Sequence, residues 1–195
     1  MTGKSGKKAE TRGALLDAAE AALIDGKGDC EISDVARRAG VSIGLSYHYY
    51  DSKDALVAAV VERFYRRLDE AAMAINPLPA GEWASREARR VRLVVEFLFG
   101  APLAPFVLGG LAGGPLVQAA EIEARGRYAA LASENFSRAR RVGLIGAETP
   151  DRLLAVQAMG GLWAVIEAAL RERKRPSTQT VAEAIWANMA AMLRL

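Results

Sequence analysis

The chain has 195 residues, of which 51% are hydrophobic and 25% charged, so it can bury a substantial core and is not a disordered protein. Its net charge of +3 is too small to indicate a nucleic-acid partner by itself. The single cysteine excludes an intramolecular disulfide, and the single histidine, His48, excludes a histidine-built metal site in the C-terminal part, so we expect no cofactor.

Residues 1–8 form a basic tail that contains glycine and serine, which we expect to be flexible and solvated. Such an arm could also follow a phosphate backbone. No apolar run follows the tail, so we expect no signal peptide and a cytoplasmic protein. From Ala9 to Asp25 apolar residues recur at helical spacing, and Gly26 ends this first predicted helix.

The next segment predicts two short helices joined by a tight turn. Ser33 is a candidate N-cap for a helix over residues 34–39, and Gly40 can adopt the left-handed conformation that ends it. Ser42 can cap a second helix over residues 43–50. This spacing is typical of a helix-turn-helix, and the second helix carries no carboxylate that phosphate would repel.

Lys53 falls in the first turn of the following helix, which Asp51 or Ser52 can cap. A cation at this end opposes the helix dipole, so it predicts a nearby anion, most simply a phosphate.

The string AGVSIGLSYHYYDSKDALVAAVV resembles the DNA-binding segment of the TetR family of bacterial transcription regulators, and the resemblance covers about residues 10–70. It implies an all-α fold, with an N-terminal three-helix domain that contains the helix-turn-helix and a C-terminal helical domain for ligand binding and dimerisation. It also implies base contacts at Ile43, Gly44 and Leu45, and phosphate contacts at Ser42, Tyr47, His48, Tyr49 and Lys53.

The chain departs from the family pattern at Leu45, where threonine is frequent, at Ser46, where a buried aliphatic residue is common, and at Tyr50, where phenylalanine is usual. Whether Leu45 or Ser46 faces the DNA is therefore open at this point.

Apolar spacing predicts one long amphipathic helix over residues 53–73, and the segment NPLPAG at 76–81 breaks it. We therefore expect a helix-turn-helix domain at 9–55, a connecting helix at 56–75 and a regulatory domain at 76–195.

Ser85 can cap the next helix, whose outer face carries four arginines. A solvated basic face is the default interpretation, and an anionic ligand or a second DNA contact is the alternative. Residues 97–120 are uncharged and long enough to span a membrane. Their prolines and glycines favour short buried helices and turns instead, so we expect no membrane span.

A long helix is predicted over residues 116–142, and Thr149 is expected to cap the next one, with Pro150 at its first position. The stretch 153–166 has Gln157 as its only polar side chain. A helix that is apolar all round must be covered on all sides.

Thr180 and Glu183 form a candidate capping box for a final helix. We expect the last two helices to pair with those of a second copy, which makes the protein a homodimer, as the resemblance also implies.

A small-molecule effector is expected in the C-terminal domain, although nothing in the spacing identifies it. Aromatic residues at helical spacing are equally consistent with a plain core. The candidate lining residues are Phe64, Phe97, Phe106, Tyr128, Gln157 and Trp163. Glu96, Glu121 and Asn135 could serve a polar or cationic effector.

The sequence therefore predicts a ligand-responsive regulator that binds a palindromic double-stranded DNA operator as a dimer. We adopt the hypothesis that the protein is a repressor and that the small molecule releases it from DNA, since repression is the commoner mode in the family. The alternatives are an architectural protein with little sequence preference and a small-molecule-binding or enzymatic helical protein. One histidine and one cysteine in separate places supply no nucleophile with a base, so we expect no enzyme.

Overall fold

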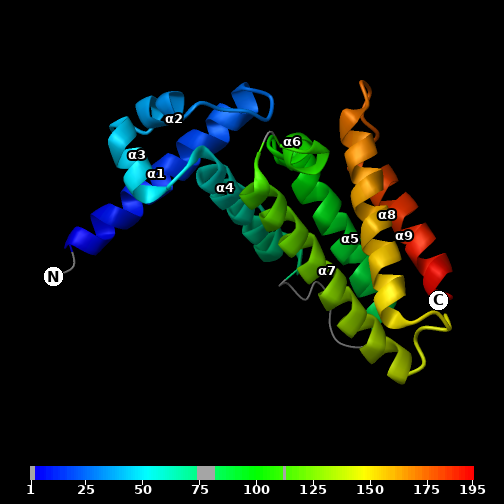
Figure 1. Ribbon diagram of the computed structural model, residues 1–195. Helices are drawn as coiled ribbons and strands as arrows, with labels where there is room; N and C mark the ends of the chain where they lie inside the picture. The colour runs from blue at the N-terminus through cyan, green and yellow to red at the C-terminus, as the bar shows by residue number, and fades with distance from the viewer. Residues whose placement is uncertain (1–2, 74–81, 112) are drawn as a thin grey trace. The chain divides into compact units, whose positions relative to one another are not determined.

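The computed structural model describes residues 3–73, 82–111 and 113–195, and within these ranges every regular element is a helix (Figure 1). This confirms the predicted all-α fold. The predicted helix break at 76–81 lies outside the described residues.

The chain packs as two compact units. The N-terminal unit contains Met1–Phe64 and Phe106–Ile122, and the C-terminal unit contains Tyr65–Pro105 and Glu123–Leu195. Two helices, α4 and α7, therefore begin in the first unit and end in the second. These units are defined by packing, and the functional division at residue 76 stays a prediction.

The first helix, α1 (Gly3–Asp25), begins before the predicted start at Ala9. The described part of the segment predicted as a flexible tail is therefore helical. Lysine and glutamate favour a helix here, and the Thr11 hydroxyl donates to the Lys7 carbonyl oxygen at 2.9 Å, a bond that only a helical backbone brings together.

The second helix, α2 (Ile32–Arg38), also starts earlier than predicted. Its N-cap is Glu31, which makes no side-chain capping bond, and Ser33 lies inside the helix. Ile32 is buried. Burial of this side chain in the first turn stabilises the earlier start more than a serine cap would stabilise the later one.

Arg63 ties α4 (Lys53–Leu68) to α1. Its Nη1 donates to Asp17 Oδ1 at 2.6 Å, and its Nη2 donates to Glu20 Oε2 at 2.7 Å and to the Leu16 carbonyl oxygen at 2.8 Å. Because the guanidinium is buried, this cluster fixes how the two helices cross.

The long helix predicted over residues 53–73 is confirmed, with one difference at its end. After Leu68 the backbone continues as a π-helical turn, η1 (Asp69–Met73).

Asp54, in the first turn of α4, binds the beginning of α7 (Pro115–Arg141), which follows the short helix α6 (Ala104–Gly109). The Gly114 amide donates to Asp54 Oδ1 at 2.6 Å, and the Leu116 amide donates to Asp54 Oδ2 at 2.9 Å. A side chain at Gly114 would place its Cβ 2.9 Å from Asp54 Oδ2, so the contact requires glycine there.

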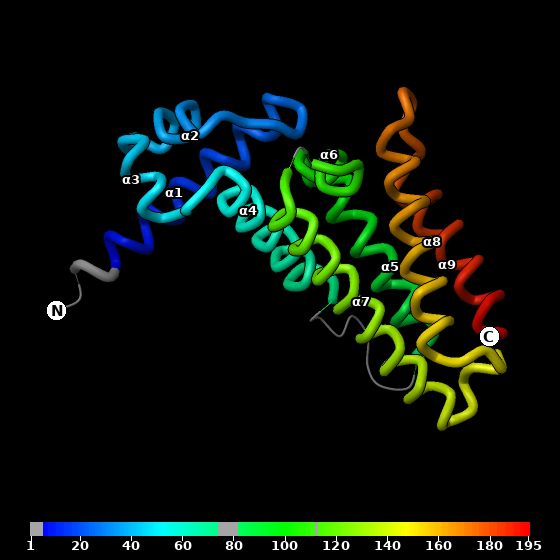
Figure 2. Tube along the Cα trace, in the orientation of Figure 1, coloured from blue at the N-terminus to red at the C-terminus, as the bar shows by residue number. Residues whose placement is uncertain are grey.

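In the C-terminal unit α5 (Trp83–Gly100) and α8 (Asp151–Arg171) both pack against α9 (Thr178–Leu193), with α7 beside them (Figures 1 and 2). The final turn of α7 also fixes the start of α8. There Arg140 Nε donates to Asp151 Oδ1 at 2.8 Å, and Arg140 Nη2 donates to the Thr149 carbonyl oxygen at 2.8 Å.

The starts of these helices differ slightly from the predicted caps. The Ser177 hydroxyl, rather than Thr180, caps α9, because it accepts from the Thr180 amide at 3.0 Å. Burial of Trp83 moves the start of α5 ahead of Ser85. The observed N-caps are Glu82 for α5, Pro150 for α8 in place of Thr149, and Ser177 for α9.

The helix α8 leaves an apolar strip uncovered within the chain. It consists of Leu153, 55% exposed, and Val156, 53% exposed, which share one side of the helix, whereas Val165, also at the surface, lies on another side. By length and composition alone α8 could cross a membrane, but 44% of its most apolar stretch is buried by other helices, so this is weak evidence for a span.

We expect Arg63→Met to destabilise the chain by about 2–4 kcal/mol, because it removes the buried guanidinium that donates to the Glu20 carboxylate and to the Leu16 carbonyl oxygen. Urea unfolding should show this loss, and Arg66→Met, an exposed arginine on the same helix, is the control. A loss below about 1 kcal/mol, as for a surface ion pair, would contradict this role for Arg63.

Candidate nucleic-acid interface and cavity

The turn between α2 and α3 (Ile43–Tyr49) has the predicted geometry. Gly40 has a φ of +68°, and the Ser42 hydroxyl accepts from the Leu45 amide at 3.1 Å, which caps α3. The helix ends one residue earlier than predicted, because Tyr50 is extended and buried. Arg12 of α1 lies over the Tyr50 ring at 5.7 Å and donates its Nε–H to the Tyr50 hydroxyl at 3.4 Å.

The structure decides which of two neighbouring residues faces outward. Leu45 is 38% exposed, whereas Ser46 is 2% exposed and its hydroxyl donates to the Ser42 carbonyl oxygen at 3.3 Å. Since this local bond satisfies the serine hydroxyl, the residue can be buried, and Leu45 lies on the surface. The exposed set on and beside α3 is Ser42, Ile43, Gly44, Leu45, Tyr47 and His48.

Gly44 lies in the middle of this exposed surface. A Cβ added there would meet no heavy atom within 4 Å. The fold therefore does not require glycine at this position, although glycine is unfavourable inside a helix. Without a side chain at this position, the backbone of α3 is open to close approach from outside.

The anion predicted beside Lys53 is a carboxylate of the same chain. Lys53 Nζ lies 2.6 Å from Asp29 Oδ1. This hydrogen bond lowers the pKa of Asp29 and raises that of Lys53. Because its ammonium has three donors, Lys53 can bind a phosphate either beside Asp29 or in place of it. Tyr49, another predicted phosphate contact, is half-buried, and its ring meets the His48 ring edge-on at 5.7 Å.

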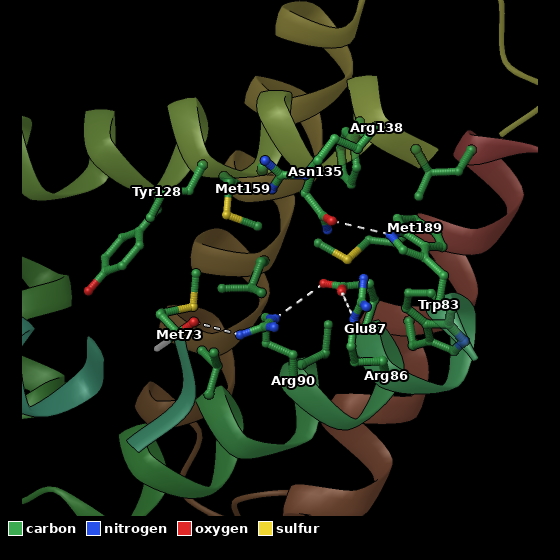
Figure 3. Close-up of a pocket in the computed structure, with 18 of the residues that line it drawn as sticks. Met73, Trp83, Arg86, Glu87, Arg90, Tyr128, Asn135, Arg138, Met159 and Met189 are labelled. Carbon is green, nitrogen blue, oxygen red and sulfur yellow. Dashed lines mark hydrogen bonds and ion pairs between the residues drawn. The ribbon is translucent and has the colours of Figure 1, made fainter. Parts of the chain in front are cut away.

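A cavity of about 380 Å³ lies within the C-terminal unit, between α5, α7, α8 and α9 (Figure 3). All three tryptophans of the sequence line it, namely Trp83, Trp163 and Trp186. Met73 at the end of η1 lines it as well.

Two of the six predicted ligand contacts, Tyr128 and Trp163, line this cavity. The structure does not bring the other four to this cavity, and their role as ligand contacts stays a prediction. Gln157 lines a smaller hollow of about 90 Å³ between α8 and α9. Phe64 and Phe106 belong to the N-terminal unit, where Phe64 is part of the core, and Phe97 is half-buried elsewhere on α5.

The arginine-rich face of α5 is only partly solvated. Arg86 and Arg90 line the cavity, where Glu87 lies between them (Figure 3). Arg86 Nε donates to Glu87 Oε1 at 3.0 Å, and Arg90 Nε donates to Glu87 Oε2 at 3.2 Å. By contrast, Arg89 and Arg92 are on the surface, and Arg89 lies 3.6 Å from Glu96. The default interpretation, a solvated basic face, is therefore wrong for Arg86 and Arg90.

Arg90 also contacts the end of η1, because its Nη1 donates to the carbonyl oxygens of Ala72 at 2.8 Å and Met73 at 2.7 Å. Sequence reasoning missed its role in the cavity, although a signal was present. Arg90 lies one turn before Val94, on the stripe that α5 buries.

Three other side chains of the cavity wall carry polar groups that matter here. Asn135 and Tyr128 each make a hydrogen bond, and the indole nitrogen of Trp163 makes none to the residues that the structure describes. Asn135 Oδ1 accepts from Trp83 Nε1 at 3.2 Å. The Tyr128 hydroxyl donates to the Tyr65 carbonyl oxygen at 3.2 Å, and burial raises the pKa of Tyr128, so the phenol stays protonated. Trp163 is 6% exposed, and its Nε1 is buried with no hydrogen-bond partner.

The described residues contain no cluster of three or more histidine, cysteine, aspartate or glutamate side chains that could hold a metal ion. Cys30 is buried, and burial raises the pKa of its thiol, which disfavours the reactive thiolate.

Residues 15–60 match the sequence model of the tetR family of bacterial regulatory proteins. Among curated proteins, the HTH-type transcriptional regulator BetI of Cronobacter sakazakii is 38% identical over 93 residues, which cover 47% of this chain and 45% of BetI. The aligned part therefore spans less than half the length of this relative.

Two solved structures resemble the fold over nearly the whole chain. The fatty acid degradation regulator FadR from Bacillus halodurans has a TM-score of 0.77 at 17% identity, covering 91% of this chain and 93% of FadR. The regulator FadR from Bacillus subtilis, in complex with stearoyl-CoA, has a TM-score of 0.73 at 16% identity, covering 92% and 97%. At these identities the likeness is one of fold.

We expect Gly44→Ala to raise the free energy of unfolding by about 0.5–1 kcal/mol, because alanine favours a helix and the added methyl group meets no neighbour. Thermal or urea unfolding of the wild-type chain and the variant measures this difference in the free energy of unfolding. A destabilised variant would show that the fold itself needs glycine at this position.

Proposed function

We propose that this chain, which belongs to the TetR family of bacterial regulatory proteins, is a cytoplasmic transcription regulator that binds double-stranded DNA through α3 and responds to a small molecule held in the cavity. The observation that carries the proposal is the exposed surface of α3. It has no carboxylate, displays Tyr47 and His48 as donors, and is free of a side chain at Gly44. Such a helix can enter the major groove without repulsion from the phosphates.

The base contacts fall to Ile43, Gly44 and Leu45, and the phosphate contacts to Ser42, Tyr47, His48, Tyr49 and Lys53. The outward position of Leu45 supports its place in the first group. Lys53 joins the second group when a phosphate binds beside Asp29 or in place of it.

A homodimer is the second part of the proposal. The uncovered strip at Leu153 and Val156 on α8 supports pairing of α8 and α9 with a second copy. A dimer with its two α3 helices about 34 Å apart would meet successive major grooves of a palindromic operator.

A small-molecule effector is the third part. The cavity lies at the lower end of the range of about 300–1,000 Å³ that is usual for ligand sites. The stearoyl-CoA complex of FadR from Bacillus subtilis is a precedent on the same fold for a bound effector. The effector releases the protein from DNA by binding better to a state that fits DNA poorly, which makes the protein a repressor.

We expect selection from a random DNA pool to enrich an inverted repeat. Tyr47→Phe should weaken binding to this site and to scrambled DNA alike, by about 0.5–1.5 kcal/mol, because it removes one donor to phosphate. Ile43→Ala should instead change the preferred sequence. If the wild-type chain binds scrambled competitor as tightly as the winner, it is an architectural protein rather than a sequence-specific regulator.

We expect Val156→Arg to convert the dimer into a monomer, because it places a charge in the apolar strip of α8. Sedimentation velocity measures the change in mass. Val142→Arg, which alters an exposed valine outside α8, is the control and should remain dimeric. A dimer that survives Val156→Arg would mean that the copies meet elsewhere.

A further inference from the structure

We propose that the cavity binds an amphipathic organic anion, with a carboxylate among the donors of α5 and α7 and an apolar body against the tryptophans. This names the chemical class of the effector, and it rests on the proposed function only in taking the cavity as the effector site.

The charges that line the cavity favour an anion. Arg86 and Arg90 line it together with its single acid, Glu87, whereas the third arginine of the wall, Arg138, is 61% exposed and lies 3.8 Å from Glu134. Both oxygens of Glu87 already accept from Arg86 and Arg90. Glu87 therefore holds Arg86 and Arg90 side by side, and these three side chains together keep a net positive charge. The side chains of Arg86 and Arg90 are 18% and 20% exposed, so water screens this charge only in part.

The hydrogen-bonding groups without partners are donors. Among the residues that the structure describes, the terminal nitrogens of Arg86 have no partner. The Trp83 indole can only donate, so it fixes Asn135 Oδ1 as the acceptor and leaves the Asn135 amide nitrogen as a donor. The Trp163 Nε1 is a third donor, buried and unpaired. A buried donor without a partner is costly, and a carboxylate supplies the acceptors that this set lacks.

The rest of the wall is suited to an apolar body. The three tryptophans are joined there by Met73, Met159 and Met189, whose flexible side chains can adapt to the shape of a guest. The cavity volume of about 380 Å³ fits a single chain or ring system rather than a large conjugate. The class is therefore a monocarboxylic acid with a medium-sized apolar part.

An aromatic wall can also enclose a cation, so a cationic ligand is the alternative to the anion proposed here. A cation would need an available carboxylate, yet Glu87 is engaged by two arginines that would repel it. The two classes are separated by ligands that share one body and differ only in their head group.

The test compares decanoate, decan-1-ol and decylammonium at neutral pH, below the concentrations at which they form micelles. The readout is the intrinsic fluorescence of the full chain without DNA, which reports on the cavity because every tryptophan lines it. We expect saturable binding of decanoate at least about tenfold tighter than decan-1-ol, with decylammonium weakest. Equal binding of acid and alcohol, tighter binding of the ammonium, or no saturable binding of decanoate would overturn the proposal.

A pair of variants tests the head-group site. Arg86→Gln should weaken decanoate binding by about tenfold and leave decan-1-ol binding unchanged, a difference that general damage to the fold would not produce. Arg92→Gln, an exposed arginine on the same helix outside the cavity, is the matched control and should change neither. An equal loss for acid and alcohol in Arg86→Gln, or no loss for the acid, would contradict the assignment.

These outcomes are independent of the proposed function, because the assay contains no DNA. If the chain binds decanoate but no specific DNA, the anion-binding cavity stands and the proposed function as a transcription regulator falls. If the chain binds an operator but prefers decylammonium, the proposed function stands and the anion-binding cavity falls.

Discussion

The carboxylate of Asp54 joins the beginnings of the two helices that run through both packing units. It accepts hydrogen bonds from the Gly114 and Leu116 amides at the start of α7, and it lies in the first turn of α4, directly after the turn that follows α3. From this contact α7 continues to Tyr128 and the rest of its cavity-lining face, and α4 continues through η1 to Met73, which also lines the cavity. The two helices that meet at Asp54 therefore also supply residues of the cavity wall.

The two sites have complementary chemistry in this account. The surface of α3 offers donors and no acid to the phosphates of DNA, whereas the cavity offers donors within an apolar wall to a small anion. Arg90 belongs to the cavity and also donates to the carbonyl oxygens of Ala72 and Met73 in η1. A carboxylate that draws Arg90 toward itself weakens these two bonds at the end of the α4 segment. Under the proposed function, a ligand that favoured a different arrangement of η1 would supply the differential binding that regulation requires.

The helix-turn-helix was predictable because its signals are local: Gly40 adopts its positive φ, and Ser42 caps the helix three residues before Leu45. The outward position of Leu45 was not predictable, since it depends on a bond from Ser46 that only the folded backbone brings into range. The pairing of Lys53 was missed for a similar reason, because Asp29 is 24 residues away in the chain. Helical periodicity identified inward-facing aromatic residues in the C-terminal half. It could not tell which of them line the cavity and which belong to the core, because that depends on how α5, α7, α8 and α9 pack together.

Under the proposed function, the cavity and the DNA-binding surface are energetically coupled. The most direct test measures the affinity of decanoate, by tryptophan fluorescence, for the free chain and for the chain saturated with its selected operator. Coupling between two sites is reciprocal and commonly amounts to about 5- to 150-fold. The account predicts that operator weakens decanoate binding by the same factor by which decanoate weakens operator binding. Equal affinity of decanoate for the free and the operator-bound chain would contradict it.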